Sequence, residues 1–327
     1  MKLKKIYLGK FALLLFLCNI SLQAQTVPYN LNNPVRIRPF GDSITYGVQF
    51  AYGFPFCYVS AVNQFICSPP IAIGGGYRGW MAVFSFNNDG IVFSTEGYQA
   101  GGSNISQWES FTQMHDGYPG WTTADLIPIA GLPSFSDITL VHAGTNDMWP
   151  ILKIANPTDA QIDQIASTAG ANLFLLLNQL LVNNPKAYIF VAKIIQVSAP
   201  QASYFNFDYN TVNKVIFKYN NYISNNWINV PPANRARMAL VDMSQLLQQG
   251  SDYSGDGVHP NASGYMKIAC TWIRAIKGKQ PNLQEPCAGV ADAKSIQKMT
   301  PSESETKQMT LPKEQFQKML QGKLRPQ

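Results

Sequence analysis

The sequence predicts an α/β protein with three layers, α/β/α, around a five-stranded parallel sheet. Short apolar runs, which are typical of buried parallel strands, recur along the chain. Segments with helical spacing of apolar residues lie between several of these runs. This alternation gives βαβ units with right-handed crossovers and helices on both faces of the sheet. Residues 25–287 are long enough to form one well-buried domain.

The elements follow in chain order. The five predicted strands are Val35–Phe40, Gly90–Ser94, Asp137–Ala143, Ala187–Ile195 and Met238–Asp242. Three amphipathic helices are predicted at Asp159–Val182, Asn210–Asn225 and Ala262–Lys277. The segment from Val48 to Met114 is rich in glycine and aromatic residues, and we expect one short helix, one strand and long loops there.

The N-terminus has the pattern of a signal peptide. A lysine-rich start precedes the apolar run Phe11–Cys18, and the small residue Ala24 precedes Gln25. The apolar run is too short to span a bilayer comfortably, so we expect no stable membrane insertion. Residues 1–24 are therefore expected to be removed from a secreted or periplasmic protein. Residues 288–327 form a polar tail that we expect to be partly disordered.

Charge and cysteine content narrow the class of protein. Removing the signal peptide takes four of the 25 basic residues and none of the 19 acidic ones, which leaves a formal charge of only +2. No clustered Lys/Arg remains to indicate nucleic-acid binding. An exported chain with four remaining cysteines predicts two disulfides, with Cys57–Cys67 and Cys270–Cys287 suggested by proximity in sequence. Four buried free thiols are the alternative. No Cys/His pattern predicts a metal site.

A turn directly after the first predicted strand carries the first candidate for chemistry. Gly41-Asp42-Ser43 ends that strand, at the edge where a parallel sheet presents side chains to a ligand. Ser43 is therefore a candidate nucleophile. Taken alone, Asp and Ser here are more typical of a turn or helix cap, so this assignment depends on the downstream residues.

A base and an acid occur together late in the chain. Asp256 and His259 are three residues apart, so the carboxylate can hold one imidazole nitrogen while the other faces a serine. A helix cap beside a surface histidine is the alternative. The order Ser, Asp, His is that of the α/β hydrolases.

Two further segments contain candidate donors for an oxyanion. Asn146 follows the strand that ends at Ala143, and a side-chain amide there can stabilise the negative charge of a tetrahedral intermediate. Gly120 lies in a loop where the absence of a side chain lets an acyl group approach the main-chain N–H. Taken alone, the Asn146 segment is better explained by an ordinary turn, and a Pro-Gly turn explains the Gly120 segment equally well.

In this order, the segments resemble those of the SGNH (GDSL-type) hydrolase superfamily across Val35–Lys277. Within it, the chain is most similar to carbohydrate esterase family three, the acetyl xylan esterase-like branch. The matching segments are Pro39 to Thr45, Gly76-Tyr77-Arg78, His115 to Trp121, Gly144-Thr145-Asn146-Asp147, and Asp256 to Asn261 followed by Gly264-Tyr265. The region from Val48 to Met114 departs from the family in being longer and more aromatic, which leaves substrate choice open.

This resemblance implies a flavodoxin-like SGNH hydrolase fold and a serine mechanism. Ser43 would be the nucleophile, His259 the base and Asp256 the acid that orients it. The oxyanion hole would comprise the Ser43 N–H, the Gly120 N–H and the Asn146 side chain. No metal or cofactor is expected. We give His115 and His142 no catalytic role, and expect the first at the cleft rim and the second in the core or behind the site.

These features predict an exported esterase that removes short acyl groups, above all O-acetyl, from a polysaccharide. Tyr77, Trp121 and Trp149 are candidates for stacking on sugar rings, although packing alone would explain each. A lipid-directed esterase or lysophospholipase is one alternative, and a non-catalytic carbohydrate-binding protein on the same fold is another. The sequence leaves the oligomeric state open.

Overall fold

The structure is a computed structural model, and most of the chain between residues 35 and 278 can be described in it. The described residues are 35–48, 57–59, 64–67, 75–84, 93–100, 114–201, 206–278 and 310–312. The predicted signal peptide and nearly all of the predicted tail lie outside these residues, so the predicted domain boundaries stay predictions.

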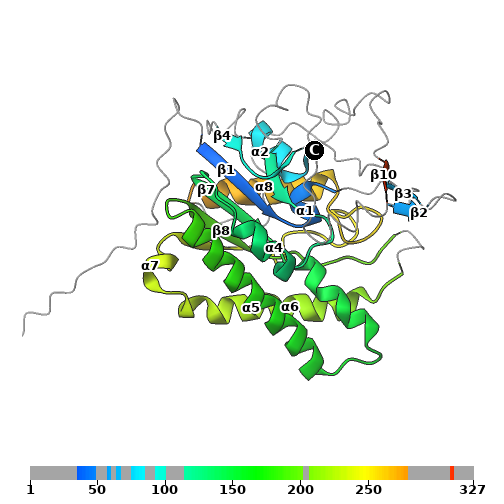
Figure 1. Cartoon of the computed structure of the whole chain (residues 1–327). Helices are drawn as coiled ribbons and strands as arrows, with labels where there is room; N and C mark the ends of the chain where they lie inside the picture. Colours follow the sequence, from blue (N-terminus) through cyan, green and yellow to red (C-terminus); the bar gives the residue numbers. More distant parts are fainter. Residues whose placement is uncertain are drawn as a thin grey trace, which may run out of the picture.

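A mostly parallel sheet forms the centre of the molecule (Figure 1). Strands β1 (Val35–Gly41), β7 (Ile138–His142), β8 (Tyr188–Lys193) and β9 (Met238–Asp242) pair in parallel in that order.

The other edge of β1 is shared by two short strands, β4 (Phe93–Thr95) and β6 (Met114–Gly117). Strand β5 (Gln99–Ala100) extends the sheet antiparallel to β6. If β4 and β6 are counted together as one strand position beside β1, the parallel strands lie in the order β4/β6, β1, β7, β8, β9. Numbered along the chain, this is 2-1-3-4-5, the flavodoxin-like arrangement.

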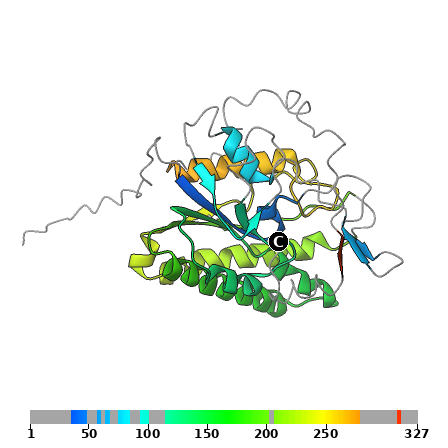
Figure 2. The same cartoon turned by 45° about the horizontal axis from the view of Figure 1, so that its top comes forward.

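Helices cover both faces of the sheet, as the sequence predicts (Figures 1 and 2). One face is covered by α4 (Thr123–Ala130), α5 (Asp159–Asn183) and α6 (Tyr209–Asn226). The other is covered by α2 (Tyr77–Phe84) and α8 (Ala262–Ile276). Shorter helical segments are α1 (Ser43–Tyr46), η3 (Thr145–Lys153), η4 (Trp227–Asn229) and α7 (Pro232–Arg235).

Local sequence signals explain where the main helices begin. Helix α5 starts with a capping box, in which Thr158 and Gln161 each bond the other's main chain. Helix α8 starts at Asn261, whose side chain accepts a hydrogen bond from Gly264 N. Among the helices in the described ranges, α5 alone has the length and apolar composition of a membrane span. Five of its leucines, all except the exposed Leu175, pack in the core beside α4 and α6, as expected for a central helix of a folded domain.

A small antiparallel sheet of β2 (Cys57–Val59), β3 (Gln64–Cys67) and β10 (Thr310–Pro312) lies beside the main domain. Its register places Cys57 opposite Cys67. Cys270 is buried in α8, and Cys287 lies outside the described residues. Both predicted disulfide pairings therefore stay predictions.

The predicted fold class is confirmed, although the sheet has seven strands within the described residues where we expected five, because the short strands β5 and β6 extend it. We expected the residues of β6 to lie in a loop, and we made no prediction for those of helix α4. These two elements flank the loop between Gly117 and Thr123, and the pairing of Gly117 with Gly41 places that loop at the carboxyl end of β1.

Candidate active site

The candidate nucleophile lies at the junction of β1 and α1. Gly41 has a positive φ of 156°, and a Cβ on it would lie 1.9 Å from the main-chain oxygen of His142, so no other residue fits. Asp42 caps α1, because its carboxylate accepts a hydrogen bond from Ile44 N at 3.0 Å. Ser43 is the first helical residue, and its N–H has no acceptor within the helix. The turn therefore caps the helix and also presents the serine.

Three predicted site residues form a hydrogen-bonded chain. His259 Nε2 lies 2.7 Å from Ser43 Oγ, and His259 Nδ1 lies 2.5 Å from Asp256 Oδ2. The serine and the histidine are 216 residues apart in sequence. With Nδ1–H donated to the carboxylate, Nε2 is left as the acceptor that a serine hydroxyl needs. This arrangement can remove the proton from Ser43 as it attacks a carbonyl.

A tight turn fixes Asp256 in an ionised form. Its second oxygen, Oδ1, accepts hydrogen bonds from Val258 N at 2.9 Å and His259 N at 3.0 Å. Burial alone would raise the pKa of Asp256, but the charge and hydrogen bond of His259 and these main-chain N–H groups bring it below its ordinary value. The carboxylate can therefore stabilise an imidazolium without taking its proton.

The two other predicted oxyanion donors lie next to each other. Asn146 lies in the first turn of η3, and its Nδ2 donates a hydrogen bond to Trp121 O at 2.9 Å. Gly120 directly precedes Trp121, is exposed and has φ +81°. Among the described residues, no atom lies within 4 Å of the position a Gly120 Cβ would take. The loop thus leaves open space beside the Gly120 main chain.

These features agree with the comparison to known proteins. The sequence matches the GDSL-like Lipase/Acylhydrolase family over residues 40–267, which is more than half of the chain. The chain belongs to this family.

One curated relative of this GDSL-family chain is described as an esterase. The chain is 26% identical over 265 residues to this multidomain esterase of Ruminococcus flavefaciens, an alignment that covers 75% of this chain and spans only 28% of that protein. It resembles in fold a carbohydrate esterase family 3 structure from Talaromyces cellulolyticus, with 21% identity, 75% of this chain and 99% of that one covered, and a TM-score of 0.50. An acetyl esterase mutant with acetate ion gives 21% identity, the same coverage and a TM-score of 0.48.

A buried carboxylate, Asp147, links the two segments that carry the candidate oxyanion donors. Asp147 Oδ2 accepts a hydrogen bond from Thr123 N at 2.8 Å, and its Oδ1 accepts one from Thr123 Oγ1 at 2.6 Å. Burial raises the pKa of Asp147 to about 6, and the Thr123 hydrogen bonds oppose that rise. We predicted no role for Asp147, although it directly follows the candidate donor Asn146 in sequence.

Two buried residues of the Gly-Tyr-Arg segment, Tyr77 and Arg78, donate hydrogen bonds to α1. Tyr77 Oη donates to Thr45 Oγ1 at 3.2 Å, and Arg78 donates to the main-chain oxygens of Thr45 at 3.2 Å and Tyr46 at 3.0 Å. Burial lowers the pKa of Arg78 to about 10. Tyr77 is 0% exposed. The expectation that Tyr77 stacks on a sugar is therefore not supported, because its ring is enclosed in the core and positions the nucleophile's helix.

Trp121 and Trp149 both keep partial exposure. Trp121 stacks on Tyr118 with ring centroids 4.5 Å apart, and Trp149 meets Phe207 edge-on at 5.2 Å. Each ring is thus held in place by an aromatic neighbour. Trp121 adjoins Gly120 directly, and Trp149 lies three residues after Asn146. Their predicted contact with substrate stays a prediction.

The other two histidines lie inside the fold. His115 is fully buried in β6, not at a cleft rim, and its Nδ1 accepts a hydrogen bond from Gly117 N at 3.0 Å. His142 is fully buried at the end of β7, and neither ring nitrogen has a hydrogen-bond partner among the described residues. Burial lowers the pKa of His142 to about 4, so it is neutral at pH 7. The described residues contain no group of three or more His, Cys, Asp or Glu side chains suited to a metal.

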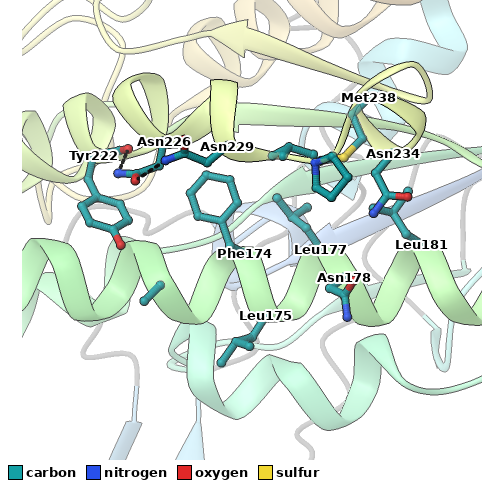
Figure 3. Close-up of a pocket in the computed structure, with 13 residues that line it drawn as sticks. Phe174, Leu175, Leu177, Asn178, Leu181, Tyr222, Asn226, Asn229, Asn234 and Met238 are labelled. Carbon is teal, nitrogen blue, oxygen red and sulfur yellow. Dashed lines mark hydrogen bonds between the residues drawn. The ribbon is translucent and has the colours of Figure 1, made fainter.

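A hollow occurs away from these residues, on the outer helical layer. It is a cavity of about 490 Å³ between α5, the end of α6, η4 and α7 (Figure 3). Phe174, Leu177 and Leu181 project into it from α5, and Asn234 and Met238 border it on the side of α7 and β9. No triad or oxyanion residue lines it.

Proposed function

We propose that this protein is an exported serine esterase that removes short acyl groups, chiefly O-acetyl, from a polysaccharide. The observation that carries the proposal is the continuous hydrogen-bonded chain from Ser43 Oγ through His259 to Asp256. A serine, an imidazole and a buried carboxylate in this geometry form the constellation used for acyl transfer.

The reaction follows from the atoms in the site. Ser43 Oγ attacks the ester carbonyl while His259 Nε2 takes its proton, and Asp256 stabilises the imidazolium that results. The N–H groups of Ser43 and Gly120 and the amide of Asn146 bind the oxyanion. His259 then gives its proton to the leaving alcohol, which leaves an acetyl-enzyme. Water, activated by the same imidazole, releases acetate and restores Ser43.

The preference for a carbohydrate ester rests on chemistry and on the relatives. Trp121 is a partly exposed aromatic next to the oxyanion loop, a position suited to stacking on a sugar ring. The fold relative from Talaromyces cellulolyticus belongs to a carbohydrate esterase family, and the curated relative is an esterase of several domains. Because the chain spans only 28% of that relative, its substrate is part of the proposal.

Export is supported by the N-terminal sequence. Its lysine-rich start, apolar run and small residue at Ala24 are the features of a cleaved signal. We propose that the mature protein begins at Gln25 and acts outside the cytoplasm. Mass spectrometry of protein purified from the medium or periplasm tests this, and an intact Met1 would contradict it.

One assay series tests the proposed reaction. The substrates are p-nitrophenyl acetate, a long-chain p-nitrophenyl ester and acetylated xylan, each given to the wild type, to Ser43→Ala and to the control Ser167→Ala on α5. Acetate release that Ser43→Ala abolishes and Ser167→Ala leaves unchanged supports the proposal. A preference for the long chain would indicate a lipid-directed esterase instead. No Ser43-dependent hydrolysis of any substrate would indicate a binding protein.

A further inference from the structure

A buried ion pair lies beneath the loop that carries Gly120. Arg38 of β1 and Asp116 of β6 are 1% and 0% exposed, and Arg38 Nε donates to Asp116 Oδ2 at 2.6 Å. The guanidinium also lies 5.2 Å from the centre of the Phe40 ring. Desolvating two charges is costly, and a buried ion pair often stabilises a fold no better than apolar residues would. This pair therefore calls for a role besides stability.

The pair is bonded to both ends of the loop and helix that follow β6. Asp116 Oδ1 accepts a hydrogen bond from Tyr118 Oη at 3.1 Å. Arg38 Nη2 donates to Ile129 O, in the last turn of α4, at 3.1 Å. The ion pair thus fixes the chain just before Gly120 and the far end of the helix just after it.

Tyr118 carries this constraint to the oxyanion donors. Its main-chain N–H donates to Gly41 O at 2.9 Å, and its ring stacks on Trp121 at an interplanar angle of 27°. Trp121 O in turn accepts the side-chain N–H of Asn146. Gly120 lies between the two stacked aromatics. A series of contacts therefore links the ion pair through Tyr118 and Trp121 to Asn146, and Gly120 lies in the chain between the two aromatic residues.

We propose that Arg38, Asp116 and Tyr118 are positioning residues for the oxyanion hole. They hold the Gly120 N–H and the Asn146 amide where the charge of the tetrahedral intermediate develops. Donors that are fixed in advance lower the barrier without having to reorganise, whereas a loose loop loses this advantage. The inference rests on the proposed esterase function and adds the residues that set its transition-state geometry.

The test removes one oxygen atom and leaves the ion pair intact. Tyr118→Phe keeps the ring on Trp121 and removes the hydroxyl that donates to Asp116 and also interacts with the Gln99 side chain. The matched control is Tyr188→Phe, which deletes the half-buried hydroxyl that donates to Met238 O at 3.2 Å on β9. We measure kcat and KM with p-nitrophenyl acetate, inhibition by methylboronic acid, and Tm. The boronic acid forms a tetrahedral adduct with a reactive serine and reports on the oxyanion hole directly.

For Tyr118→Phe, we expect kcat to fall about tenfold, a fraction of the 10²–10³ loss for deleting a donor. KM should stay within about twofold, because the ground-state ester hardly uses these donors. Affinity for methylboronic acid should fall by about the same factor as kcat. Tyr188→Phe should leave all three quantities near the wild type.

Two outcomes overturn the inference, and they are distinguishable. If the wild type shows Ser43-dependent hydrolysis but Tyr118→Phe keeps its kcat and boronate affinity within twofold, Tyr118 is merely structural, even if Tm falls. If the wild type shows no Ser43-dependent hydrolysis, the proposed function fails and this inference with it. As a second check, Tyr118→Phe should have less effect in an Asn146→Ala background, because both changes act on one loop.

Discussion

The side-chain amide of Asn146 donates one of its two N–H groups to the main-chain oxygen of Trp121 at 2.9 Å. That bond fixes the orientation of the amide plane and leaves the second N–H for a ligand. It also joins η3, which follows β7, to the loop after β6, so that one contact sets the spacing of two proposed oxyanion donors. Asn146 is thus a proposed oxyanion donor that also holds the loop in place.

Replacing this amide should impair the transition state more than substrate binding. We expect Asn146→Ala to lower kcat by about 10²–10³ with little change in KM, since the oxyanion exists only after attack. The control is Asn178→Ala, which removes an exposed amide on α5 at the hollow between α5 and α7. Steady-state kinetics with p-nitrophenyl acetate measure both. A rise in KM at unchanged kcat would show that Asn146 binds substrate and not the oxyanion.

Much of this fold could be predicted because its signals are local. The predicted strand Met238–Asp242 has the same bounds in the structure, and the predicted helix Asp159–Val182 is one residue longer. An apolar run or a helical period is contained within the element itself, so one segment of sequence is enough to predict it.

Strand β6 could not be predicted in this way, because its stability depends on a distant residue. His115 and Asp116 are polar yet fully buried, and Asp116 is neutralised by Arg38, 78 positions earlier. Helix α4 did have a readable signal, the capping box between Thr122 and Asp125. The sequence motifs were enough to predict the candidate site residues, but they do not indicate whether the Tyr77 side chain is buried or exposed. Spacing says nothing about which side of α2 faces the core.

The buried capping residue Asp42 should make stability depend on pH. Burial raises its pKa from 3.8 to about 6, although the Ile44 N–H and the charge of His259 oppose the rise. An acid whose pKa is higher in the folded state stabilises the fold below its unfolded pKa, and this contribution is lost as pH rises through the folded value. The affected range therefore runs from about pH 4 to pH 7.

Asp42→Asn isolates this effect, since asparagine also caps helices and can accept from Ile44 N. We expect the unfolding free energy of the wild type, minus that of the variant, to fall on the order of 2–3 kcal/mol between pH 4 and 7. Urea unfolding at each pH measures the difference. Acids far from Asp42 titrate in both proteins and cancel, whereas the measured difference includes the coupling of Asp42 to His259 and Asp147. A difference that is flat or rises with pH contradicts the assignment.

Two arginines on β1 allow a direct comparison of buried and exposed ion pairs. The side chains of Arg38 and Asp116 are 2% and 0% exposed, whereas those of Arg36 and Asp137 are 46% and 43% exposed. Arg38→Met should cost about 3–5 kcal/mol of unfolding free energy, because Asp116 is left charged and buried. Arg36→Met should cost about 0–1 kcal/mol.

Removing both buried charges should restore part of the loss. The double variant Arg38→Met, Asp116→Asn leaves no uncompensated charge, so we expect it to be more stable than Arg38→Met alone. Urea unfolding at pH 7 of the wild type and the three variants measures this series. Equal losses for Arg38→Met and Arg36→Met would show that the buried position of the first pair has no energetic consequence.

Gly120 and Gly250 form a matched pair for separating backbone strain from catalysis. Their φ angles are +81° and +79°, both residues are exposed, and a Cβ on either would meet no described atom within 4 Å. Alanine at each position carries the same left-handed penalty, about 1–2 kcal/mol. The two substitutions should therefore lower Tm by similar amounts.

Only Gly120→Ala should reduce turnover. Its methyl group would stand beside the N–H that we assign to the oxyanion, and relief of the strained φ would turn that N–H away. We expect kcat to fall at least tenfold in Gly120→Ala, by analogy with the 10²–10³ effect of losing a donor, and to change less than twofold in Gly250→Ala. Kinetics with p-nitrophenyl acetate, beside Tm for each variant, separate the two effects. If both variants lose activity in proportion to their loss of stability, Gly120 contributes through the fold and not through its N–H.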